Sequence, residues 1–409
     1  MAPAEQDIIK EGNALFRAYL IPDDGSGGKW EQKGVPTKAM PVFYNPKMGE
    51  NRDLSVFAVQ AWNRGKRNSL TMGDIFCGSG IRGIRYITDL MNVSPRVDFV
   101  DMNPKAIKSC RQNLKLNGID ESEHGLHVRG ANDFLYQKAL HKEERFDVID
   151  VDPFGNPMKY MSGALEALDR KRGLLHVNAT DLAVLAGVHF LPARRKYQTI
   201  PLKNVTYHAE QAARIVVGAI ARKAMQLDIG ITPLLSMADK HFIKLVLETK
   251  HGATHANRLL PEVGYIVQCR ICWNKFTVPM EAIVKQDTCP FCSGNKMDHG
   301  GPIWIGELQN KQFCLKVYQV SRTMDLKQSS KSLQRKIHLC FEEAGMTVMS
   351  FDIHQLSKEM KVGPPKLEDI ISKLEERGWK ASRTQFNPTG IKTLAPREIV
   401  RDIVLELEK

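Results

Sequence analysis

The sequence contains no long apolar run. No window approaches about twenty uncharged apolar residues, the length that a membrane-spanning helix requires. The richest window, residues 174–191, is interrupted by four polar side chains, namely His176, Asn178, Asp181 and His189. The first ten residues include Glu5 and Asp7 and no apolar stretch, unlike a secretory signal. We therefore expect neither a membrane span nor export.

The sequence also lacks a disulfide framework. Of its eight cysteines, four are scattered among apolar neighbours, and four form two Cys-x-x-Cys pairs with sixteen residues between the pairs. Each pair predicts a tight knuckle, and two knuckles close a tetrahedral metal site. We expect a structural zinc ion, with a redox dithiol as the alternative, and a reducing compartment, the cytoplasm. The predicted ligands are Cys269, Cys272, Cys289 and Cys292.

Basic residues outnumber acidic ones, giving a net charge of +12 and a preference for polyanionic partners. The excess is dense in residues 192–223, which hold seven basic side chains and one acidic one, Glu210. A solvated basic face is the alternative interpretation of such a run. The local density favours a surface that contacts phosphates.

Strands alternate with helices from residue 70 onward. We expect strands at 70–76, 97–100, 127–128, 146–151 and 174–178. We expect one helix after the first strand that ends at residue 89, and further helices at 105–116, 161–168 and 208–226. This alternation predicts a parallel, doubly wound sheet of the α/β class.

The pattern changes near Gly230, so we place a domain border between residues 235 and 236. Two further strands are expected at 231–235 and 241–249, and the cysteine pairs predict a zinc ribbon over 265–306. Residues 350–395 contain an expected order of helix, helix and short strand, which is winged-helix-like. The second domain is thus predicted to be α+β with a zinc-ribbon insertion.

A glycine-rich loop follows the strand expected at residues 70–76. Gly78, Gly80 and Gly83 form G-x-G-x-x-G, and Asp101 lies 23 residues beyond Gly78 at a strand end, where a carboxylate can accept ribose hydroxyls. The glycines alone fit either a dinucleotide or S-adenosylmethionine. Asp74, placed to contact a methionine ammonium group, favours S-adenosylmethionine.

Two neighbouring segments support the same choice of cofactor. Asp101 leads directly into a helix, and the turn Ala131-Asn132 follows the third strand, where such folds contact adenine. A tight turn with packing glycines is the alternative.

The motif Asp152-Pro153-Phe154-Gly155 ends the fourth strand, where open α/β sheets carry their chemistry. An exocyclic base amine is a poor nucleophile, because its lone pair is delocalised into the ring. A carboxylate and a backbone carbonyl can accept its two N–H bonds and stabilise the charge that develops during methylation. Proline fixes the carbonyl direction, and the aromatic ring stacks on an extruded base. A simple strand-ending turn is the alternative.

The sequence resembles the tRNA (guanine-N2)-dimethyltransferases that act on guanine 26, in their archaeal form. The resemblance is carried by residues 42–48 (VFYNPKM), 51–54 (NRDL), 80–85 (GIRGIR), 152–155 (DPFG) and 383–393 (RTQFNPTGIKT). These stretches extend over essentially the whole chain. The first and last are distinctive, whereas the glycine loop is not. The implied fold is a Rossmann-like class I methyltransferase domain followed by the α+β domain.

The resemblance implies roles for individual residues. Arg52 and Arg82 would contact the cofactor near its methionine carboxylate, Asp101 its ribose, and Gly130, Ala131 and Asn132 its adenine side. At position 130 the family often has aspartate, so no side-chain contact is expected there.

The resemblance also implies how the target base is held. Phe43 and Phe154 would sandwich the guanine, while Asp152 and the Pro153 carbonyl engage N2. The product would be monomethylated or dimethylated guanine in tRNA, with no obligate protein partner.

Two other functions are compatible with parts of the pattern. One is a DNA amino-methyltransferase, since Asp-Pro-aromatic loops also serve adenine and cytosine. The other is a non-catalytic RNA-binding module, against which the intact Asp74, Asp101 and Asp152 argue.

Overall fold

The computed structural model describes residues 6–19, 31–32, 35–36, 40–63, 67–286, 288–324, 326, 330–346 and 349–408. The chain forms two compact units. Unit 1 comprises Met1–Pro153, Ser162–Val177 and Lys316–Gln334, and unit 2 comprises Phe154–Met161, Asn178–Leu315 and Arg335–Lys409. The border expected between residues 235 and 236 separates two predicted functional domains, and the division into these two compact units does not test that border.

Unit 1 is built on parallel strands in the order β9-β8-β5-β6-β7. The strands are β5 (Ser69–Ile75), β6 (Ser94–Asp101), β7 (Gly125–Val128), β8 (Val148–Val151) and β9 (Gly173–Ala179). All residues of β8 and β9 are buried, as expected for central parallel strands covered on both faces. The predicted parallel α/β sheet is confirmed.

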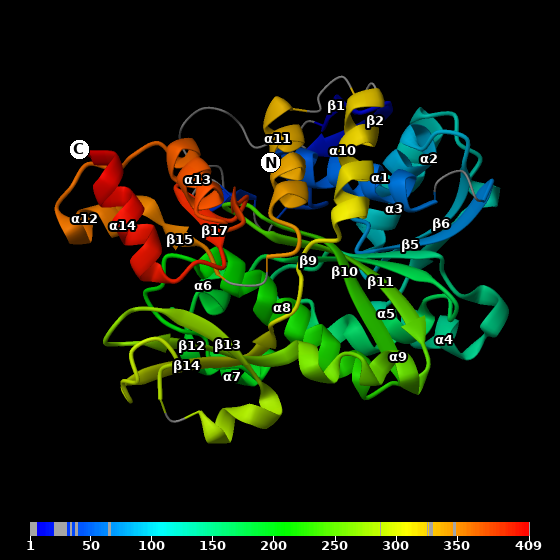
Figure 1. The fold of residues 1–409 in the computed structure, drawn as a ribbon. Helices are drawn as coiled ribbons and strands as arrows, with labels where there is room; N and C mark the ends of the chain where they lie inside the picture. Colours follow the sequence, from blue (N-terminus) through cyan, green and yellow to red (C-terminus); the bar gives the residue numbers. More distant parts are fainter. Residues whose placement is uncertain are drawn as a thin grey trace. The chain divides into compact units, whose positions relative to one another are not determined.

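Helices cover both faces of this sheet (Figure 1). On one face lie α1 (Gly49–Asn63), α2 (Ile81–Asp89) and α3 (Pro104–Leu116), and on the other lie α4 (Ala131–Leu140) and α5 (Met161–Ala167). Close packing of α2 on β6 depends on Gly83, because a Cβ atom there would lie 2.2 Å from Cε1 of Phe99. The glycine loop therefore has a packing role as well as a place beside the sheet.

An N-terminal hairpin, β1 (Gln6–Glu11) and β2 (Ala14–Tyr19), packs against α2 and α3. Asn117 and Asn113 accept hydrogen bonds from the N–H groups of Leu15 and Arg17, each at 2.8 Å. The hairpin is therefore fixed to unit 1 through backbone groups of β2. Two short strands of two residues each, β3 (Glu31–Gln32) and β4 (Val35–Pro36), follow the hairpin in the chain and pair with each other.

Unit 2 contains α6 (Leu182–Leu185), α7 (Phe190–Tyr197), α8 (His208–Met225) and the antiparallel strands β10 (Ile229–Ala238) and β11 (Ile243–His251). Helix α8 packs against β10 on one side and against β14 (Met297–Trp304) on the other. Because it is covered on several sides, most of its residues are buried.

Strand β14 belongs to a three-stranded sheet in the order β13-β12-β14, with β12 (Val263–Cys269) and β13 (Lys275–Pro279). Helices α9 (Ala253–Asn257), α10 (Lys311–Thr323) and α11 (Lys331–Glu342) precede and follow this sheet in the chain.

The C-terminal part of unit 2 has its own apolar core, centred on Ile353, Ile370, Leu374 and Ile403. Its elements are β15 (Phe351–Asp352), α12 (Ile353–Met360), α13 (Leu367–Glu376), β16 (Ala381–Arg383), β17 (Gly390–Thr393) and α14 (Arg397–Glu408). The expected order of helix, helix and strand is present, and the strands pair in the order β15-β17-β16. Among the described residues, no helix has the length and apolar composition that crossing a membrane would need.

Candidate active site and metal site

The glycine loop connects β5 to α2 and approaches the end of β6. Gly78 has a φ of +53° and donates its N–H to Oδ2 of Asp101 at 3.1 Å, while Asp101 Oδ1 accepts the N–H of Asn103 at 2.8 Å. Gly80, with a φ of +80°, lies so close to α3 that a Cβ atom would be 2.5 Å from Sγ of Cys110. The structure thus brings together the predicted residues Gly78 and Asp101.

Asp74 lies beneath this loop at the end of β5. It is 3% exposed, and its Oδ2 accepts the N–H of Gly83 at 3.0 Å. Burial raises the pKa of Asp74 to about 7, with the nearby carboxylates of Asp150 and Asp152 adding to the rise and Arg82 opposing it. Asp74 therefore has a direct role in holding the start of α2.

The predicted adenine-side residues begin α4. Gly130 is the N-cap, and Ala131 and Asn132 form the first turn. The segment lies next to Asp101, the predicted ribose contact, because Arg129 donates its N–H to the backbone carbonyl of Asp101 at 3.1 Å. Gly130 has an ordinary φ of −68°, and a Cβ atom there would meet nothing within 4 Å. Glycine is therefore not required at this position for space or for backbone conformation.

Arg82 on α2 connects two carboxylates at the end of β8. Its Nη1 donates to Asp150 Oδ2 at 3.3 Å, and its Nη2 donates to Oδ2 of Asp152. Burial lowers the pKa of Arg82, but the charges of Asp150 and Asp152 outweigh this effect and raise it. The guanidinium group thus remains charged and fixes the carboxylate of Asp152.

Three neutral side chains complete this cluster. Asn51 and Ser55, both on α1, accept from Nη1 of Arg82 at 3.1 and 3.0 Å, and the Tyr86 hydroxyl donates to Asp150 at 2.9 Å. The sequence singled out Asp152 and Arg82 but did not predict that they form an ion pair.

A second buried network holds Arg52, another predicted cofactor contact. Its Nε and Nη2 each donate to a carboxylate oxygen of Glu11 at 2.6 Å, and Nη2 also donates to the carbonyl of Asn45 at 3.2 Å. Glu11 pairs as well with Arg85 at 3.0 Å, and Arg85 contacts Asp53 and Asp89 at 2.6 and 2.7 Å.

Glu11 is the centre of this network. Burial would raise the pKa of Glu11, but Arg52 and Arg85 more than compensate and lower it to about 2. The sequence pattern did not single out Glu11, although the Gly12-Asn13 dipeptide between two extended segments is a recognisable hairpin signal.

The two predicted stacking rings belong to different units. The carbonyl of Phe43 would be 3.1 Å from a Cβ atom on Gly78, so the backbone of Phe43 lies against the glycine loop. Phe154 begins unit 2 and is 46% exposed, and the next residue, Gly155, is fixed by two hydrogen bonds to Thr180, at 2.8 and 3.1 Å. The predicted sandwich of the two rings around a base stays a prediction.

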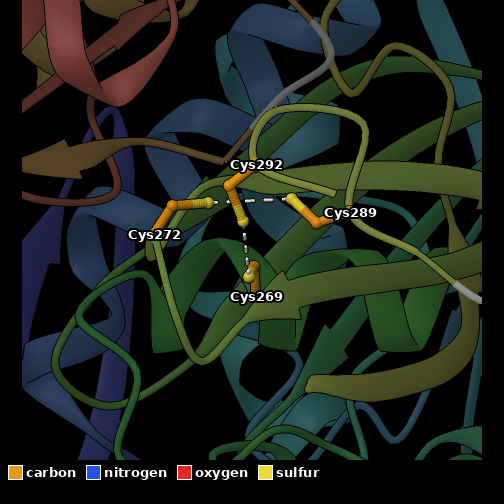
Figure 2. Close-up of side chains that lie close together, drawn as sticks. All are labelled: Cys269, Cys272, Cys289 and Cys292. Carbon is orange, nitrogen blue, oxygen red and sulfur yellow. Dashed lines mark hydrogen bonds between the residues drawn. The ribbon is translucent and has the colours of Figure 1, made fainter. Parts of the chain in front are cut away.

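The four predicted metal ligands meet in unit 2. Their Sγ atoms all lie within 4.8 Å of one another, with 3.7 Å between Cys269 and Cys292 and 3.6 Å between Cys272 and Cys289. Figure 2 shows the four thiol groups pointing toward one centre. The first pair begins at Cys269, the last residue of β12, and the second precedes β14. The arrangement could hold a metal ion.

Not all of the basic side chains in residues 192–223 lie at the surface of the protein. Arg214 is fully buried and pairs with Glu210 at 2.9 Å, and Glu210 also pairs with Lys392 at 3.0 Å. Counting Arg214 as part of a phosphate-contacting face was therefore wrong. Its charge is neutralised inside the protein because α8 is covered on several sides.

Comparison with known proteins gives a consistent result. The model of the family described as N2,N2-dimethylguanosine tRNA methyltransferase matches residues 28–405. The chain is similar to proteins named tRNA (guanine(26)-N(2))-dimethyltransferase from Methanobrevibacter smithii, with 35% identity over 90% of this chain and 92% of the relative, and from Methanosarcina acetivorans, with 34% identity over 98% of both.

A solved structure is also similar over nearly the whole length. It is the complex of Trm1 from Pyrococcus horikoshii with S-adenosyl-L-methionine, with a TM-score of 0.80 and 29% identity, covering 97% of this chain and 99% of that one. The likeness extends to both units.

Proposed function

Because this chain belongs to the N2,N2-dimethylguanosine tRNA methyltransferase family, we propose that it transfers one or two methyl groups from S-adenosyl-L-methionine to the exocyclic N2 of guanine 26 in tRNA. The observation that carries the chemistry is the carboxylate of Asp152, which a buried arginine holds at the end of β8. The glycine loop leads into α2, the helix that carries this arginine, and lies at the same edge of the sheet.

The residues of the loop fit the cofactor. Positive φ values at Gly78 and Gly80 let the backbone pass close beneath a ligand, and Asp101 supplies a half-buried carboxylate for ribose hydroxyls. We assign the adenine side to Gly130, Ala131 and Asn132 and the methionine side to Arg52, Asp74 and Arg82. When bound, S-adenosylmethionine supplies an electrophilic methyl group on a sulfonium centre.

Asp152 and Pro153 act on the acceptor amine. Arg82 occupies Oδ2 of Asp152, so we assign Oδ1 and the Pro153 carbonyl to the two N–H bonds of guanine N2. Accepting these bonds increases electron density on the nitrogen and stabilises the positive charge that develops as the methyl group arrives. The proton then leaves to water or to the Asp152 carboxylate. Phe43 and Phe154 hold the base by stacking.

The four cysteines hold a structural zinc ion in this proposal. Zn–S bonds of about 2.3 Å in a tetrahedron place the sulfur atoms about 3.8 Å apart. The two close Sγ pairs, at 3.6 and 3.7 Å, are near this spacing. Four thiolate ligands leave no open position for a substrate, so the ion stabilises the β13-β12-β14 sheet and does not take part in methyl transfer.

Residues 236–409 form the tRNA-binding domain, which grips the RNA by phosphate contacts and shape. Within it, residues 265–306 are the zinc ribbon and residues 350–395 the winged-helix-like part. The enzyme works in the cytoplasm, where tRNA is available and cysteine thiols stay reduced.

The test is methylation of unmodified tRNA transcripts with labelled S-adenosylmethionine, followed by mass spectrometry of the nucleosides. We expect N2-methylguanosine and N2,N2-dimethylguanosine from position 26, and no product from a transcript with adenine at that position. Duplex DNA serves as the second substrate. Label in DNA, or in an adenine or cytosine amine, would refute the proposal.

A further inference from the structure

Unit 2 contains a pocket of about 350 Å³ whose charged lining is entirely basic. One wall is formed by residues 156–159, and the others come from the end of α7 and the C-terminal half of α8. Among the described residues that line it, none is acidic. The charged ones are Lys159, Arg195, Lys196, Arg222 and Lys223.

The acceptors that the protein offers to Arg222 are uncharged. Arg222 donates to the backbone carbonyls of Tyr197 and Pro302, at 2.6 and 3.1 Å, and these acceptors carry no net charge. Burial accordingly lowers the pKa of Arg222 to about 10. Lys196 does have a carboxylate partner, Asp181, at 3.4 Å. Five basic side chains and no acidic one in the described lining of a single concave site favour an anionic ligand.

The position of this pocket in the chain relates it to the target base. Residues 156–159 begin two positions after Phe154, the residue to which we assign base stacking. Five residues span at most about 18 Å, so Lys159 lies within that distance of Phe154. A stacked strand advances about 3.4 Å per nucleotide, so this reach corresponds to about five nucleotides.

We propose that this pocket binds a backbone phosphate of the tRNA within a few nucleotides of the guanine that is methylated. The inference rests on the proposed function and adds a specific contact to it. Arginine and lysine donors in this number suit the phosphate oxygens, and Asn156, Gln198 and Gln226 add neutral amide donors to the lining. A phosphate held here would fix the register of the RNA while its base is extruded.

The first experiment uses the double variant Arg195→Ala/Lys223→Ala. Arg222 is left intact because it caps the end of α7. The matched control, Lys108→Ala/Lys115→Ala, removes two exposed charges from α3 of unit 1. Binding of tRNA is measured over a range of salt concentrations, together with kcat and KM and with calorimetric binding of S-adenosylmethionine.

We expect the pocket variant to bind tRNA about 10-fold more weakly at low salt, as for the loss of a charge-assisted contact. Its slope of log K against log salt concentration should be shallower by about 0.7 to 0.9, the contribution of one phosphate. Binding of S-adenosylmethionine stays unchanged. Equal effects in the two double variants would overturn the proposal.

The second experiment locates the phosphate. Single methylphosphonate linkages, which are neutral, are placed at successive positions within five nucleotides of guanine 26. At one position the substitution should weaken binding to the wild-type protein but not to the pocket variant, because each change removes the same contact. Additive losses at every position would refute a phosphate contact near the target.

Free anions are the other possible occupants. Inorganic phosphate and pyrophosphate are therefore titrated against the wild-type protein and the pocket variant. Pocket-dependent binding of these ions, with an unchanged salt slope for tRNA, would assign the site to a small anion and overturn the proposal. If the wild-type enzyme methylates no tRNA at all, it is the proposed function that fails, which the methylation assay reports separately.

Discussion

Glu11→Gln tests how strongly the N-terminal hairpin is held by charge. The substitution preserves the size of the side chain but removes the negative charge between two guanidinium groups. Arg52 would then keep the carbonyl of Asn45 and one uncharged amide oxygen at position 11 as acceptors, whereas Arg85 would keep the carboxylates of Asp53 and Asp89. We therefore expect the hairpin and α1 to separate more easily.

The magnitude follows from the pKa of Glu11. The native environment lowers it from 4.5 to about 2, and the group is 4% exposed. Each pH unit between the two pKa values corresponds to about 1.4 kcal/mol, so the ionised carboxylate contributes roughly 3 kcal/mol to the free energy of unfolding. Because the folded-state pKa is the lower one, this contribution is complete above about pH 5 and is lost as the pH falls toward 2.

The assay is urea-induced unfolding at pH 7, 5 and 3, followed by circular dichroism and tryptophan fluorescence. Wild type and variant should differ by roughly 3 kcal/mol at pH 7 and 5 and by less than half of that at pH 3. The exposed Glu123→Gln is the control and should change stability by less than about 0.5 kcal/mol. A difference that does not depend on pH would show that charge is not what Glu11 contributes.

Three further predictions concern the site. Asp152→Asn should lower single-turnover methyl transfer by about a hundred-fold or more with unchanged calorimetric binding of S-adenosylmethionine, and wild-type turnover would contradict the assigned role. Gly83→Ala should destabilise the protein by about 1–3 kcal/mol in denaturant unfolding, because the added methyl group overlaps Phe99. The control Gly130→Ala should be nearly neutral, and equal effects of the two substitutions would be incompatible with this packing. Elemental analysis of the purified protein should find one zinc ion per chain and a loss of zinc in Cys272→Ser, and a metal-free wild type would exclude the structural role.

Much of the fold could be predicted because its signals are local. The short apolar runs of β5 to β9, and the turn at residues 117–118 after α3, are visible in a few residues at a time. The cysteine spacing likewise determines which four thiols can meet. The parallel sheet then places the ends of neighbouring strands at one edge, which explains why Gly78 and Asp101, both predicted as cofactor contacts, lie together.

The ion pairs could not be predicted, because they depend on side-chain directions across large separations in sequence. Arg52 and Glu11 are 41 residues apart, and Arg82 and Asp152 are 70 apart. Charge counting along the chain also failed for Arg214, since it does not register burial. There a local signal existed, because Glu210 lies four residues earlier on the same helix, the spacing at which opposite charges pair.

The open space around Gly130 has a consequence for engineering. In the glycine loop, Gly78, Gly80 and Gly83 each have a close neighbour, so an added side chain disturbs the packing there. Position 130 has no such neighbour among the described residues within 4 Å, and a side chain can be introduced there without moving the backbone. If the proposed adenine contact at Gly130 is correct, such a substitution changes affinity for the methyl donor and leaves the position of Asp152 unchanged.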